Sequence, residues 1–101
     1  MELERYAGGT GLTAAFVGDV DSLNAAELEE RLLKEIEGVT ELTVDLKKLE
    51  YISSAGLHLL FKMHCLMKKQ GSMVIINADD EVMELFVMTG FVRLLNIAVK
   101  E

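Results

Sequence analysis

The sequence predicts a single α/β domain over residues 1–101, with a mostly parallel central sheet, an antiparallel N-terminal strand and helices packed on the sheet. Two short strand patterns flank the glycine-rich turn "AGGTG", which predicts an N-terminal hairpin. Helical and strand patterns then alternate to the end of the chain, and strands joined through helices run parallel by right-handed crossovers. We therefore expect the order β-β-α-β-α-β-α-β in one domain.

The first half of the chain contains the hairpin and one helix. The predicted strands run from Leu3 to Tyr6 and from Leu12 to Val17. The stretch "DVDSLNAAELEERLLKEIEG" predicts a helix that Ser22 or Asn24 caps and that Gly38 ends. Apolar residues recur along it at helical spacing, namely Ala25, Leu28, Leu32 and Ile36.

The second half alternates strands and helices. "ELTVDLKKL" predicts a strand at residues 41–46, and a second helix should run over residues 54–70. "SMVIIN" is the next strand, and "EVMELFVMT" is a third helix with Asp79 or Asp80 as its cap. We expect a last strand over residues 94–99.

Composition excludes several classes of function. The net charge is −7 and the ten Lys and Arg residues are scattered, so no basic stripe favours direct nucleic acid binding. A lone Cys65 cannot form an intramolecular disulfide, and its spacing from His58 and His64 is not that of a zinc site. The acidic start lacks a signal peptide pattern, and apolar runs are far too short for membrane insertion. We expect a cytoplasmic protein without metal or cofactor.

The stretch "YISSAGLHLL" places two adjacent serines at the start of the second predicted helix. Serine is a preferred N-cap residue, and one hydroxyl is enough for capping. Either Ser53 or Ser54 can be the cap, which leaves the other hydroxyl spare. Because unpaired N–H groups and the helix dipole favour negative charge at a helix start, a phosphate would be stabilised at this place.

Catalysis is disfavoured at the serine pair. "ISSAG" lacks the G-x-S-x-G pattern of a nucleophile elbow, and His58 and His64 lie on the same helix as Ser54, where they are poorly placed to act as its base. Asp19, Asp21 and Asp45 superficially imitate the acidic site of a two-component receiver domain, in which an Asp accepts phosphate. This interpretation is also disfavoured, because no lysine stands at the end of the fifth strand, where such a site requires one. We therefore predict that the chain is not an enzyme.

A projection of the second helix separates polar and apolar faces. The solvated face contains His58, Lys62 and Lys69. An apolar flank contains Leu59, Met63 and Leu66. This flank is either buried in the domain or an apolar strip available to a partner. Cys65 is expected to be a small core residue.

The chain resembles the STAS domain of bacterial anti-sigma factor antagonists. The resemblance is carried by "VGDVDSLNAAEL", "LTVDLKKLEYISSAGLHLL" and "GSMVIINADDEVMELFVMTGF", in that order, and covers nearly the whole chain. Its most specific part is the serine-glycine helix start, here "SSAGL". In this alignment Ser54 takes the phosphoacceptor position, and Ser53 stands where many members have Asp.

The resemblance implies a partner switch in transcription regulation. Family members bind an anti-sigma factor with serine kinase activity, phosphorylation at the position of Ser54 ends the binding, and a serine phosphatase restores it. The partner-binding residues implied here are Asp21, Ser53, Gly56, Leu57, Leu59 and Met63, with Ser53 also as helix cap. The alternative is a stand-alone STAS subunit that docks on a transporter or a larger signalling assembly and is never phosphorylated.

Overall fold

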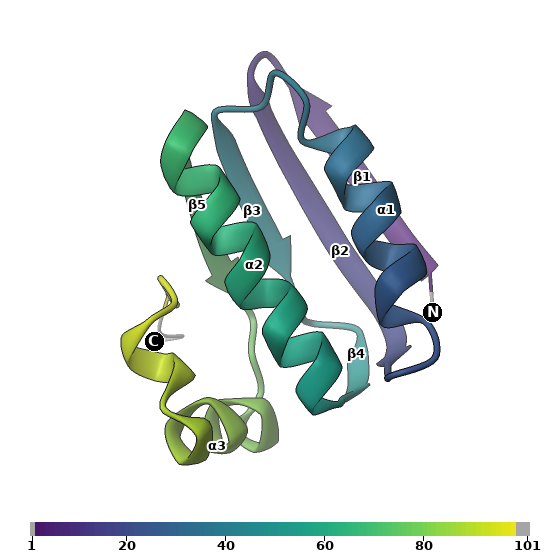
Figure 1. Ribbon diagram of the computed structural model, residues 1–101, viewed down its shortest axis with the longest axis vertical. Helices are drawn as coiled ribbons and strands as arrows, with labels where there is room; N and C mark the ends of the chain where they lie inside the picture. The colour runs from purple at the N-terminus through teal and green to yellow at the C-terminus, as the bar shows by residue number, and fades with distance from the viewer. Residues whose placement is uncertain (1, 99–101) are drawn as a thin grey trace.

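The structure is a computed structural model that describes residues 2–98. Its strands and helices follow the chain in the order shown in Figure 1. They are β1 (Glu2–Gly8), β2 (Gly11–Val20), α1 (Ala25–Glu35), β3 (Glu41–Asp45), β4 (Leu49–Ile52), α2 (Ser54–Gln70), β5 (Ser72–Ile76), α3 (Asp80–Thr89) and the 3-10 turn η1 (Phe91–Arg93).

The strands form a mixed sheet in the order β1-β2-β3-β5, and β4 pairs with the C-terminal end of β2. β1 is antiparallel to β2, and the pairs β2–β3, β2–β4 and β3–β5 are parallel. Figure 1 shows α1 and α2 side by side on one face of the sheet, with α3 at one end. The predicted fold class, a mostly parallel sheet with an antiparallel first strand, is confirmed.

The core lies between the sheet and the helices α1 and α2. Successive strand residues point to opposite faces of a sheet, so alternate positions of each strand face the helices. These inward positions are Leu12, Ala14 and Phe16 on β2, Leu42 and Val44 on β3, and Met73 and Ile75 on β5. The helices contribute the buried side chains Leu28, Leu32, Leu60, Met67 and Phe86. Apolar contact across these layers holds the elements in place.

Strand β4 is missing from the sequence-based prediction, which treats "KKLEYI" as a link. Its two ends, Leu49 and Ile52, are buried, whereas Glu50 and Tyr51 between them are exposed. Four residues with this burial pattern show no alternation of period two, so the sequence does not reveal the strand. Pairing with β2 places the end of β4, and therefore the start of α2, beside Val20.

The predicted strand over residues 94–99 is wrong at its start. The chain turns at η1, where the amides of Leu94 and Leu95 both donate to the carbonyl of Phe91. Those amides are therefore not available for a sheet. Further on, the Ile75 amide donates to the Asn96 carbonyl and the Ala98 amide donates to the Ile75 carbonyl, both at 2.9 Å, so residues 96–98 pair with β5. Ile97 forms the bridge, parallel to Ile75 of β5, and Val99 lies outside the described residues.

The helix caps follow the prediction at α3 and depart from it at α1. Asp79 caps α3, since its carboxylate accepts a hydrogen bond from the Val82 amide at 2.9 Å. Asn24 occupies the N-cap position of α1 but makes no side-chain cap bond. Helix α1 ends at Glu35, with Ile36 as its C-cap residue, so it stops before the predicted end at Gly38.

Candidate functional site

The turn from β4 into α2 fixes the geometry of the two serines. Ser53 has an extended backbone, and its amide donates to the carbonyl of Val20 at 2.8 Å. Its hydroxyl oxygen accepts a hydrogen bond from the amide of Gly56 at 3.3 Å. Ser53 is therefore the N-cap residue of α2, tied to β2 by its backbone and to the helix by its side chain.

Ser54 differs from Ser53 in exposure and in bonding. It is the first residue of α2 and its side chain is exposed. Within residues 2–98, no hydrogen bond engages its hydroxyl, whereas the Ser53 hydroxyl is used by the cap. The structure thus places one serine in a structural role and leaves the neighbouring hydroxyl open to solvent.

Gly56 brings α2 into close contact with the sheet. A Cβ atom at this position would lie 2.6 Å from Cγ1 of Ile52 and 2.9 Å from Cγ1 of Val20, closer than carbon atoms can approach. Gly56 and the neighbouring Leu57 are both buried. The sheet already covers both residues, which argues against the expected direct contact with a partner, and that contact stays a prediction.

Of the two alternatives for the apolar flank of α2, burial in the domain is the one found. The side chains of Leu59 and Met63 are 3% and 1% exposed. Helix α1 packs beside α2 and the sheet lies beneath both helices, so this flank of α2 faces the core (Figure 1). Leu59 still lines a groove between α1 and α2, and contact of these two residues with a partner stays a prediction.

The exposed face of α2 is polar. His58, Lys62 and Lys69 are exposed, which confirms the predicted solvated face. Cys65 is exposed as well, so its expected place in the core is wrong. Cys65 lies seven residues, about two helical turns, after His58, so the helical projection itself places it on the polar face.

The loop between β2 and α1 lies beside the serines, because Val20 at its start is paired with Ile52 and accepts the hydrogen bond from Ser53. The half-buried carboxylate of Asp21 accepts hydrogen bonds from the amides of Leu23 and Asn24, at 2.9 and 3.0 Å. These bonds close the loop on itself. Asp21 therefore shapes the loop from within.

Two exposed apolar side chains near the serines were missed by the sequence-based reasoning. Leu23, at the tip of the β2–α1 loop, is 91% exposed, and Tyr51 of β4 is 55% exposed. Tyr51 is paired with Asp19, immediately before the loop. The available signal was an apolar residue inside the polar loop "DVDSLN" and an aromatic residue two positions before Ser53.

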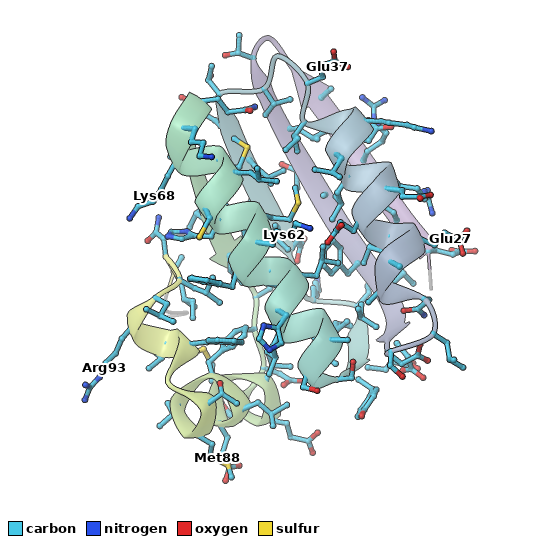
Figure 2. All side chains as sticks on the ribbon, in the orientation of Figure 1. Glu27, Glu37, Lys62, Lys68, Met88 and Arg93 are labelled. Carbon is cyan, nitrogen blue, oxygen red and sulfur yellow. The ribbon has the colours of Figure 1, made fainter. Side chains whose placement is uncertain are left out.

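A groove of about 290 Å³ separates the first turns of α1 and α2. Its lining consists of Ser22, Ala25, Ala26, Glu29, Ala55, His58, Leu59 and Lys62. The ammonium of Lys62 donates to the Glu29 carboxylate across the groove at 3.1 Å, and Figure 2 shows Lys62 between the two helices. This ion pair joins α1 to α2 one turn beyond His58.

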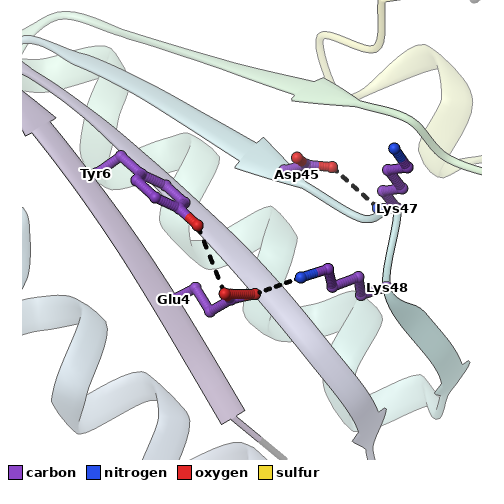
Figure 3. Close-up of polar contacts among 5 residues, drawn as sticks. All are labelled: Glu4, Tyr6, Asp45, Lys47 and Lys48. Atoms are coloured by element: carbon purple, nitrogen blue, oxygen red, sulfur yellow. Dashed lines mark hydrogen bonds and ion pairs between the residues drawn. The ribbon is translucent and has the colours of Figure 1, made fainter.

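The opposite face of the sheet carries a separate set of polar contacts (Figure 3). The ammonium of Lys48 donates to the Glu4 carboxylate at 3.0 Å, and this hydrogen bond and its charge attraction raise the pKa of Lys48 above its ordinary value. The Asp45 carboxylate accepts from the Lys47 amide and from the Asn77 side chain. These groups lie behind the sheet as seen from the helices, so they are not part of the serine site.

Residues 2–98 contain neither a cluster of metal ligands nor a helix that could span a membrane. In that part of the chain, no three His, Cys, Asp or Glu side chains are grouped closely enough to hold a metal ion. None of its helices combines the length and the apolar character needed to cross a bilayer.

The family model of the STAS domain matches residues 6–101. The chain belongs to the STAS domain family. Two relatives place this STAS protein among the anti-sigma factor antagonists. BtrV of Bordetella bronchiseptica, provisionally named an anti-sigma factor antagonist, is 36% identical over 86% of this chain and 77% of its own length. The anti-sigma-B factor antagonist of Bacillus subtilis is 31% identical over 82% of this chain and 77% of its own length.

Solved structures of the anti-sigma factor antagonist SpoIIAA share the fold of this STAS domain. The unphosphorylated form has a TM-score of 0.80 at 14% identity, covering 98% of this chain and 90% of that chain. The phosphorylated form, from Bacillus, has a TM-score of 0.74 at 14% identity, covering 98% and 93%. At this identity the likeness establishes the fold and leaves the role of each residue to the local geometry.

Proposed function

We propose that this STAS domain is a non-enzymatic anti-sigma factor antagonist whose binding to an anti-sigma factor kinase ends when Ser54 is phosphorylated. The observation that carries the proposal is the division of labour between the two serines. Ser53 uses its hydroxyl to cap α2, and the exposed hydroxyl of Ser54 is accessible to a kinase. A serine phosphatase restores binding, and regulation of transcription places the protein in the cytoplasm.

The fold can accept a phosphate on Ser54. A phosphoserine carries roughly −1.5 to −2 charges at neutral pH, and negative charge is favoured in the first turn of a helix. Ser54 is the first residue of α2, and the first turn contains no acidic side chain. The phosphate therefore adds charge at a point of the helix where it is stabilised and where no neighbour on the same turn repels it.

A bound partner would not accept the same phosphate. The β2–α1 loop and strand β4, which leads into α2, carry the exposed apolar side chains of Leu23 and Tyr51, which are suited to an apolar contact. A partner that packs over them would bury the phosphate beside Ser54, and removing a dianion from water is costly unless it is paired. Asp19 and Asp21 add negative charge in the adjoining loop.

The relatives support this proposal at the level of the family. Both curated relatives are named as anti-sigma factor antagonists, and SpoIIAA has been solved in an unphosphorylated and in a phosphorylated form. Because SpoIIAA shares this fold and has been solved in both forms, the fold itself is compatible with phosphorylation. The assignment to Ser54 rests on this chain's own geometry.

The test combines phosphorylation and binding. The protein is incubated with ATP and the kinase-type anti-sigma factor from the same genome, and the phosphate is mapped by mass spectrometry. Ser54→Ala should abolish labelling and keep binding, Ser54→Asp should weaken binding, and the neighbouring Ser53→Ala is the matched control that should remain labelled. Phosphate on another residue, with Ser54→Ala still labelled, would rule out the assignment.

A further inference from the structure

Ser54 and His58 are neighbours on the exposed face of α2. They are four residues apart, and both side chains are exposed. In an α-helix the Cβ atoms of such a pair lie about 5–6 Å apart, and side chains lean toward the N-terminus of the helix. The imidazole of His58 therefore extends over the turn that begins at Ser54.

The His58 ring is supported by an aromatic contact. Its centroid lies 5.8 Å from that of Phe91 in an edge-to-face arrangement, with an interplanar angle of 78°. Phe91 is itself stacked on Phe61, at 6.0 Å and 7°. This contact limits the motion of the ring, and within residues 2–98 neither ring nitrogen of His58 takes part in a hydrogen bond. The nitrogens are available to a new acceptor.

Charged side chains also lie on the elements next to the start of α2. Across the groove Glu29 is bound to Lys62, so its charge is compensated. On η1 the side chain of Arg93 points away from α2 (Figure 2). Helix α3 contributes the exposed acids Asp80, Glu81 and Glu84. Along α2 itself, His58 is the first basic side chain after Ser54.

We propose that protonated His58 donates a hydrogen bond to the phosphate on phosphorylated Ser54. The proposal rests on the proposed function in taking Ser54 as the modified residue. A phosphoserine loses its second proton near pH 6, and a hydrogen bond from an imidazolium N–H favours the dianionic form of the phosphate. The pairing therefore lowers the pH at which the phosphate on Ser54 loses its second proton.

The test introduces phosphoserine at position 54 during translation, so that no kinase is needed. The ³¹P chemical shift of the phosphate is followed against pH in the full-length protein. Imidazolium favours the dianion, so His58→Gln should raise the midpoint of the phosphate titration by about 0.5 pH unit. His58→Lys should restore the low midpoint, and the difference should shrink in 1 M salt.

Lys62→Gln is the matched control, because it removes one positive charge from the same face one turn further along the helix. It should leave the phosphate midpoint nearly unchanged. An unchanged midpoint in His58→Gln, or an equal shift in Lys62→Gln, would overturn the pairing. The result is independent of the kinase experiment: phosphate found on another residue would refute the proposed function and leave this measurement standing.

Discussion

The hydroxyl oxygen of Ser53 accepts a hydrogen bond from the amide of Gly56, 3.3 Å away. Both residues serve the attachment of α2 to the sheet, the serine by capping the helix and the glycine by allowing contact with Ile52 and Val20. Ser54 lies between them in the sequence and has neither role. The site therefore separates residues that hold the structure from one that is open to modification.

Ser53→Ala should lower the free energy of unfolding by about 1 kcal/mol, because loss of an N-cap serine typically costs 0.5–2 kcal/mol. Urea unfolding monitored by circular dichroism measures the change. Ser54→Ala is the control and should stay within about 0.5 kcal/mol of the unaltered protein, since its side chain is exposed. Equal losses in the two variants would contradict the assignment of Ser53 as the cap.

Gly56→Ala should destabilise the protein by about 1–2 kcal/mol. Alanine gains roughly 1 kcal/mol over glycine in a helix, but overpacking against Ile52 and Val20 costs about 1–3 kcal/mol or more. Gly8→Ala is the control, because a Cβ there meets nothing within 4 Å. A Gly56→Ala protein as stable as Gly8→Ala would show that α2 can move away from the sheet without cost.

Leu23→Ala should weaken binding of the anti-sigma factor about tenfold and leave the free energy of unfolding unchanged. The side chain is exposed at the tip of the β2–α1 loop, and truncating one of the few side chains that dominate an interface costs more than about 1 kcal/mol of binding. Calorimetry with the purified partner measures the affinity. Tyr6→Ala is the control, since Tyr6 is exposed on the other face of the sheet (Figure 3). Loss of affinity in Tyr6→Ala alone would place the interface on that face.

The ion pair of Glu4 and Lys48 should respond to alkaline pH. The pKa of Lys48 is raised from 10.5 in the folded protein, first by the hydrogen bond to Glu4. The stabilisation is therefore present below that ordinary value and is lost as the pH rises through the raised pKa. In NMR titrations Glu4→Gln should lower the pKa of Lys48, and Glu2→Gln should not. Equal effects of the two variants would mean that general charge, and not the hydrogen bond, raises it.

Cys65 should react with an aromatic disulfide reagent in the folded protein, because its side chain is exposed. The reaction is followed by absorbance, with and without urea, and should be nearly complete before unfolding begins. Cys65→Ser should change the free energy of unfolding by less than about 0.5 kcal/mol. Protection of the thiol until the protein unfolds would show that the residue is in the core after all.

Local patterns predicted much of the fold. The glycine turn between Tyr6 and Leu12 closes the β1–β2 hairpin, and Asp79 caps α3. These features depend on residues close together in the chain, so periodicity and capping rules are sufficient to find them. Strand β4 depends instead on pairing with β2, and the tail after Gly90 depends on the 3-10 turn, which local propensity did not reveal.

The sequence by itself determined the α/β class, the position of α2 and the presence of two serines at its start. Only the tertiary structure decided which side chains of α2 are available. Leu59 and Met63 are buried because α1 and the sheet meet on that side, and Leu23 is exposed because the Asp21 carboxylate closes its loop. A helical projection gives the angle between side chains, but the neighbours that cover each side come from distant parts of the chain.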